Sequence, residues 1–214
     1  NFEPTPITTT FEAAINQLDT DLIRKIKEYL AFRCNMQEIF TYPWMSDEFV
    51  NALMPSTDGI LALATPPSPT EKYVRCSLLP NICKAIVKNE RNFDEFDIFE
   101  EAQIFLDSDY TSDYSNEKLP CQKKHLGCAF VGASDKIAEL FRKAKGVIGH
   151  MPRFTHMEGF TFEKLEKPYW ADETVWLNIY LGEEKVGDLA LLSKKAALAC
   201  GIKVLSAVLV EINM

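Results

Sequence analysis

The sequence is short of positive charge and of long apolar runs. It holds 23 Lys and Arg residues against 31 Asp and Glu residues, so its formal net charge is −8. A nucleic-acid-binding domain usually has the opposite balance because it must neutralise phosphates, so nucleic acid is not expected to be the main electrostatic partner. No apolar run approaches the roughly 20 residues of a membrane-spanning helix, and the N-terminus does not read as a signal peptide. We therefore expect a cytoplasmic protein that does not contact membranes.

Several motifs of common enzyme classes are also missing. The sequence has no Gly-x4-Gly-Lys-Ser/Thr loop for phosphates and no Gly-x-Gly-x-x-Gly for dinucleotides. It has no His-Glu-x-x-His pair for zinc and no Gly-x-Ser-x-Gly nucleophile turn. Because each motif performs a definite chemical task, these absences weaken the corresponding enzyme classes.

The six cysteines are spread along the chain, which favours buried free thiols over a disulfide framework. The tightest group of metal-ligand types is Cys121, His125 and Cys128. Strand alternation from His125 onward places His125 and Cys128 on opposite faces, so a zinc site is the last-ranked hypothesis. No metal-binding, cofactor-binding or catalytic residues are assigned.

A chain of 214 residues with 47% hydrophobic content can bury a real core, and one domain over residues 1–214 suffices. A capping box, Thr9-x-x-Glu12, predicts a helical lead-in over residues 1–18. Polar and acidic composition predicts a mobile loop over residues 107–118. Apolar periods of three to four residues predict further helices, and alternation predicts strands. The expected helices cover 20–34, 77–86, 134–148 and 193–201, and the expected strands cover 38–44, 93–105, 125–132, 159–165, 174–181, 186–192 and 202–212. Because neighbouring strands are joined by hairpins, the predicted fold class is α/β of the α+β type, a mainly antiparallel sheet flanked by helices.

Several charged groups are interpreted as solvent-exposed. The pair Glu100-Glu101 could act in acid–base chemistry, but it lies in an acidic stretch where solvation is the simpler account. His150 and His156 are read as surface residues without a role. The basic helix face of Lys136, Arg142, Lys143 and Lys145 is interpreted as facing solvent rather than phosphate.

Five segments are informative because of the order in which they occur. They are Leu30-Ala-Phe-Arg-Cys-Asn-Met-Gln-Glu-Ile-Phe-Thr-Tyr-Pro-Trp44, Arg75-Cys-Ser-Leu-Leu-Pro80, Asp97-Ile-Phe-Glu-Glu-Ala-Gln-Ile-Phe105, Ala144-Lys-Gly-Val147 and Gly182-x-x-x-Val186-Gly187-x-Leu189. In this order they resemble the core region of the phenylalanyl-tRNA synthetase β chain, from about residue 20 to the last residue. The resemblance implies a class II aminoacyl-tRNA synthetase-like fold.

The resemblance also implies a non-catalytic role in translation. In that family the β core packs against the α chain, which handles ATP and phenylalanine. ATP and Mg would then reach this domain only through a partner chain, and tRNA only indirectly. Class II adenylation uses arginines to hold the triphosphate. The strand that would supply the first arginine reads Glu101-Ala-Gln103, and no arginine follows Arg153, so the closing strand cannot supply the second.

Two hypotheses of function follow. The first is a structural and subunit-docking part of a synthetase assembly, whose partner is the phenylalanyl-tRNA synthetase α chain or a similar subunit. Its interface candidates are the aromatic residues Phe11, Phe40, Tyr42 and Trp44, for each of which plain core packing is the alternative. The second is a free-standing ligase or acyl-adenylate-forming enzyme on the same fold.

Overall fold

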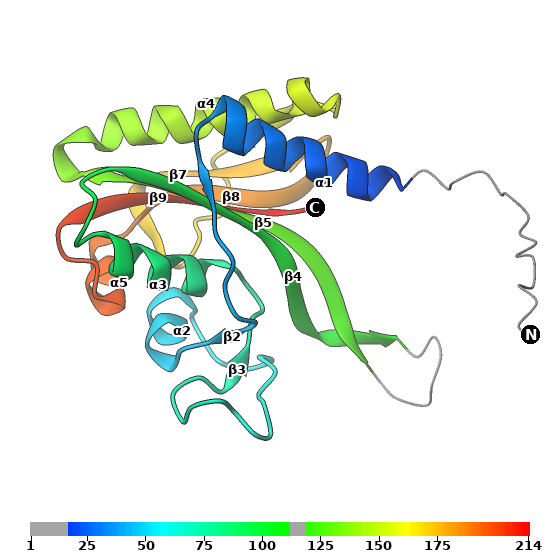
Figure 1. Ribbon diagram of the computed structural model, residues 1–214, viewed down its shortest axis with the longest axis vertical. Coiled ribbons are helices and arrows are strands. Elements are labelled where there is room, and N and C mark those ends of the chain that lie inside the picture. Colours follow the sequence, from blue (N-terminus) through cyan, green and yellow to red (C-terminus); the bar gives the residue numbers. More distant parts are fainter. Residues whose placement is uncertain (1–16, 112–118) are drawn as a thin grey trace, which may run out of the picture.

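A seven-stranded sheet forms the centre of the computed structural model, which describes residues 17–111 and 119–214 (Figure 1). The strand order is β1-β4-β5-β9-β8-β7-β6. Neighbouring strands run antiparallel, except that β1 is parallel to β4. In chain order these strands are β1 (Gln37–Glu38), β4 (Phe96–Thr111), β5 (Leu119–Ala133), β6 (Phe160–Glu163), β7 (Ala171–Leu181), β8 (Glu184–Leu192) and β9 (Leu205–Asn213).

Helices cover both faces of the sheet (Figure 1). One face carries α1 (Leu18–Glu28) with its π-helical continuation η1 (Tyr29–Arg33), and α4 (Ile137–Thr155), which follows the 3-10 turn η2 (Ser134–Lys136). The other face carries α2 (Asp47–Leu53), α3 (Leu79–Asn89) and α5 (Lys194–Cys200). A second, two-stranded sheet pairs β2 (Trp44–Met45) with β3 (Tyr73–Val74).

The central part of the sheet is buried on both faces, so its strands contribute side chains to two apolar cores. On β5, Ala129 and Val131 join the core under α3, whereas Cys128 and Phe130 join the core under α4. Side chains alternate along a strand, which is why one strand serves both layers. Burial of each large side chain contributes roughly 1.5–3 kcal/mol. The mainly antiparallel sheet flanked by helices is therefore confirmed.

Local signals placed some elements accurately. Ser193 caps α5 by accepting a hydrogen bond from the Ala196 N–H, and Gly201 ends it with a φ of 85°. Gly182 has a φ of 60° in the β7–β8 hairpin, a conformation that glycine adopts without a steric cost. Within the residues described, no helix is long and apolar enough to cross a membrane.

Two predicted segments differ from the structure. The predicted loop over 107–118 is wrong up to Thr111, because β4 runs on to Thr111 and pairs with Leu119 of β5; residues 112–118 lie outside the described part. Backbone pairing needs no apolar side chains, so a polar composition did not prevent it. The predicted strand over 38–44 is wrong in its centre. Only its first and last residues belong to strands, Glu38 to β1 and Trp44 to β2. Of the helical lead-in predicted over 1–18, residues 1–16 lie outside the described part, and α1 begins at Leu18.

Candidate functional site

Three of the four interface candidates lie on one segment that leaves the β1 edge of the sheet. The Phe40 and Tyr42 side chains are 80% and 71% exposed, so neither packs in the core. Trp44 is half-buried and stacks on Tyr42, with ring centroids 4.6 Å apart and planes 7° apart. Phe11 lies outside the described residues. The segment therefore exposes the Phe40 ring and the stacked Tyr42–Trp44 pair, and its role in an interface stays a prediction.

A buried carboxylate holds this segment in place. Glu100 of β4 accepts hydrogen bonds from the Thr41 N–H at 2.9 Å and from the Thr41 hydroxyl, 2.7 Å from Oε2. Its side chain is 2% exposed, so the expectation that Glu100 is solvated is wrong. Its neighbour Glu101 points to the other face and pairs with Lys27 at 3.2 Å. The Ile39 N–H still donates to the Phe99 carbonyl of β4 at 2.8 Å, but the Thr41 N–H donates to a side chain, so the strand pairing does not continue through Thr41.

Arg75 neutralises Glu100 and joins three chain segments. Its guanidinium NH1 lies 3.2 Å from Glu100 Oε1, and its Nε donates to the Gln103 carbonyl at 2.6 Å. Its backbone N–H donates to the Pro43 carbonyl at 2.8 Å. A buried charge pair is tolerated when further hydrogen bonds satisfy both groups, as they do here. We call Thr41, Arg75 and Glu100 the anchor cluster.

A groove of about 440 Å³ separates the aromatic segment from α3. Asn81 of α3 fixes one wall, since its side-chain amide donates to the Tyr42 carbonyl at 2.8 Å. The Lys84 ammonium binds the Glu71 carboxylate, and this hydrogen bond lowers the pKa of Glu71. The groove thus presents aromatic side chains, a residue type that is enriched in protein interfaces.

A second polar cluster lies under the start of α3. Glu211 of β9 accepts hydrogen bonds from the Ser77 hydroxyl at 2.6 Å and from the Leu78 N–H at 2.8 Å. His125 Nδ1 lies 3.0 Å from the same carboxylate. Ser77 and His125 thus both bind Glu211 and not each other. A nucleophilic serine needs the imidazole beside its hydroxyl, so this arrangement is not that of a catalytic triad. The cluster fastens α3 to the sheet.

The strand faces also bear on the zinc hypothesis. Cys128 is fully buried in the core under α4, whereas His125 faces α3, so the predicted separation of these two side chains is confirmed. Among the described residues, no group of three His, Cys, Asp or Glu side chains is arranged to hold a metal ion.

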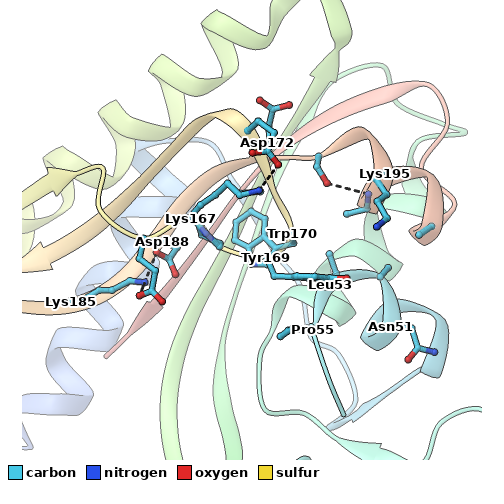
Figure 2. Close-up of a pocket in the computed structure, with 18 residues that line it drawn as sticks. Asn51, Leu53, Pro55, Lys167, Tyr169, Trp170, Asp172, Lys185, Asp188 and Lys195 are labelled. Atoms are coloured by element: carbon cyan, nitrogen blue, oxygen red, sulfur yellow. Dashed lines mark hydrogen bonds and ion pairs between the residues drawn. The ribbon is translucent and has the colours of Figure 1, made fainter. Parts of the chain in front are cut away.

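A cleft of about 980 Å³ lies between α2, α5 and residues 166–173 (Figure 2). Two of its lysines are ion-paired: Lys167 with Glu173 at 2.6 Å, and Lys185 with Asp188 at 3.0 Å. Its lining holds three lysines, the third being Lys195, against four carboxylates, a formal charge of 3 − 4 = −1. A triphosphate needs a positive site, so this cleft does not suit one.

The sheet face under α3 is filled rather than hollow. At Gly127 of β5, a Cβ atom would lie 2.5 Å from Ile82 Cδ1 and 3.0 Å from Leu78 Cβ, so α3 packs directly on the strand. Gln103, at the position expected for an adenylating arginine, is exposed on the opposite face. Among the residues described, the sheet face under α3 is therefore occupied by packed apolar side chains and leaves no open site for a nucleotide.

Sequence reasoning missed Thr41, Arg75 and Asn81. A signal for Arg75 was available, since it is the only arginine between Arg33 and Arg91 and precedes a mostly apolar helix start. Its partner Glu100 is 25 residues away, a distance that no local pattern spans. Thr41 and Asn81 carry no comparable signal.

Comparison with known proteins places the fold. The family described as "Phenylalanyl tRNA synthetase beta chain CLM domain" matches residues 4–214. Two solved structures of pyrrolysyl-tRNA synthetase from Desulfitobacterium hafniense are similar, with TM-scores of 0.68 and 0.67 at 14% and 15% identity. They cover 91% and 92% of this chain, which spans only 65% and 66% of theirs. No curated protein sequence matches. The predicted class II synthetase-like fold is confirmed.

Proposed function

The chain belongs to the family of the phenylalanyl-tRNA synthetase β chain CLM domain, and we propose that it is a non-catalytic domain that docks on another synthetase subunit. The partner is the α chain of this family or a similar subunit. ATP, Mg and the amino acid are handled by that partner.

One observation carries this proposal: the aromatic segment is exposed and at the same time held rigidly. Two aromatic side chains more than 70% exposed lie within three residues, on a backbone fixed by the anchor cluster and Asn81. If a partner covers about 150 Å² of each ring, at ~25 cal/mol per Å² each contributes roughly 4 kcal/mol before the costs of association. Rigidity lowers those costs, because little conformational freedom is lost on binding.

The charge distribution supports the non-catalytic part. The position expected for the first arginine holds Gln103, and β9 contains no arginine. The cleft of Figure 2 has its lysines opposed by carboxylates. We therefore expect no ATP–pyrophosphate exchange by the chain alone with any amino acid, biotin or lipoate. Robust exchange would favour the free-standing ligase and contradict the non-catalytic role.

The docking part is tested by capture. The tagged chain, co-expressed with the α chain of its own genome, is expected to retain it through gel filtration. The double variant Phe40→Ser/Tyr42→Ala should lose most of this retention, because it removes the exposed rings and leaves the anchor cluster intact. Tyr169→Ala is the matched control, since Tyr169 is an exposed aromatic residue (53%) at the cleft of Figure 2. Equal capture by the wild type and the double variant would refute the assignment of this surface.

A further inference from the structure

The charged side chains of α4 are all basic from Arg142 onward. Residues 140–157 hold four Lys and Arg residues and two of the three histidines, but no Asp or Glu, although the chain has 31 of them in 214 residues. This stretch is most of α4 and the turn after it. Leu140, Ala144, Ile148 and Met151 point into the core, so the basic side chains occupy the outer face.

Three of these cations have no carboxylate partner. Lys143 is already paired with Asp97 at 2.7 Å. In the described part of the chain, Arg142, Lys145 and Arg153 form no ion pair. Arg142 Nε donates to a backbone carbonyl one turn away at 3.0 Å, and the Lys145 ammonium lies 5.3 Å from the centroid of the Phe162 ring. Three uncompensated cations therefore share the exposed face of one helix.

The same face is hollowed. Gly146 and Gly149 lie between the cations, and a hollow of about 410 Å³ runs over them, bordered by Arg142, Lys145, His150 and Phe162. A Cβ atom at Gly146 would meet nothing within 4 Å, and one at Gly149 would meet only the Phe162 ring. Arg142 and Arg153 are 11 positions apart, about 16 Å at ~1.5 Å per residue. The backbone of an extended ligand can thus approach the α4 backbone closely at Gly146 and Gly149, with Arg142 and Lys145 beside the ligand.

From this juxtaposition we propose that the outer face of α4 binds the sugar–phosphate backbone of an RNA. Arg142, Lys145 and Arg153 contact phosphates of one strand, and the two glycines admit the chain between them. The face suits RNA better than a protein because its groups are mostly cationic, as in nucleic-acid interfaces, whereas the centre of a protein interface is depleted of charge. The net charge of −8 opposes non-specific RNA binding, so binding depends on a local group of unpaired cations such as this one. The choice of tRNA as the RNA rests on the family assignment above. This proposal replaces the expectations that the basic face is only solvated and that tRNA contacts are indirect.

Salt-dependent binding tests the proposal. The probe is a fluorescently labelled, unmodified phenylalanine tRNA transcript, titrated with the full chain at several salt concentrations. The test variant is Arg142→Gln/Lys145→Gln/Arg153→Gln. Its matched control is Lys194→Gln/Lys195→Gln/Lys203→Gln, which also removes three positive charges from exposed, unpaired residues described on the other side of the sheet. Each lost phosphate contact lowers the slope of log K against log salt by ~0.7–0.9, so the test variant should lose about 2–3 units of slope and at least about 100-fold in affinity at ~0.1 M salt. The control should change affinity by less than about 3-fold.

A second variant separates binding from folding. Gly146→Gln places a side chain in the hollow and replaces glycine by a better helix former, so its unfolding midpoint should not fall. We expect it to bind the transcript several-fold more weakly at unchanged net charge. The proposal is overturned if the wild type does not bind the transcript, if the triple variant binds it like the wild type, or if the control loses as much affinity. If the triple variant no longer captures the α chain but still binds the tRNA like the wild type, the basic face binds an acidic protein surface and the RNA proposal is overturned. Capture and RNA binding are separate measurements, so this proposal and the docking proposal can fail independently.

Discussion

The substitution Arg75→Ala removes the cation that neutralises the buried Glu100 carboxylate. The two side chains are 10% and 2% exposed and lie 3.2 Å apart. At an effective dielectric constant of ~20, two unit charges at this distance attract by about 5 kcal/mol. Thr41 still donates hydrogen bonds to Glu100 in the variant, which offsets part of the loss. We therefore expect the free energy of unfolding to fall by about 3–5 kcal/mol, the usual cost of leaving a buried charge without its partner.

Urea unfolding followed by circular dichroism measures this change. The cost should depend on the charge of residue 100, so Arg75→Ala introduced into a Glu100→Gln background should cost at most about 2 kcal/mol, the scale of lost hydrogen bonds. Arg24→Ala is the control: it also removes an arginine ion-paired with two carboxylates, but that pair is exposed to solvent and no measurable change is expected. A loss below about 1 kcal/mol for Arg75→Ala, or an equal loss in both backgrounds, would refute the reasoning, because the pair would then behave as a surface salt bridge.

Three further predictions concern other parts of the fold. Gly187→Ala should destabilise the protein by at least about 3 kcal/mol in urea unfolding, since its Cβ would collide with the backbone carbonyl of Glu211 on β9; a midpoint within error of the wild type would contradict this packing. Burial raises the pKa of the Asp97 carboxyl, against the opposing hydrogen bond from Lys143, so the folded state loses stability as the pH rises through this pKa. Asp97→Asn should therefore be more stable than the wild type at pH 7 and lose this advantage below about pH 4, whereas a pH-independent difference would exclude the carboxyl as its cause. Burial also raises the pKa of the half-buried Cys76 thiol to about 11, so alkylation of Cys76 at pH 8 should be about 100-fold slower in the folded chain than in urea, as measured by mass spectrometry; equal rates would contradict the shielding of this thiol.

Elements with a complete local signal could be predicted from the sequence, and elements held by distant side chains could not. The α5 helix carries its own cap at Ser193 and its own terminator at Gly201, and the β7–β8 hairpin carries Gly182. Residues 38–44 have the composition of a strand, but the Thr41 N–H is taken by the Glu100 side chain. That competition is invisible without the three-dimensional fold.

The site followed the same rule. Residue type alone nominated Phe40, Tyr42 and Trp44, because aromatic residues dominate both cores and interfaces. Their exposure could not be predicted, since it depends on how the anchor cluster turns the backbone away from the sheet. Glu100 was misjudged for a related reason: an acidic stretch indicates solvation unless an arginine 25 residues earlier is known to meet it.

Hydroxyl-radical footprinting with mass spectrometry tests the docking surface most directly. Oxidation of Phe40 and Tyr42 is compared in the chain alone and in its complex with the α chain, with the exposed Tyr169 as internal reference. We predict that oxidation of Phe40 and Tyr42 falls several-fold in the complex while that of Tyr169 stays the same. Unchanged oxidation of Phe40 and Tyr42 in a stoichiometric complex would show that the partner binds elsewhere, and would contradict the docking role of the aromatic segment.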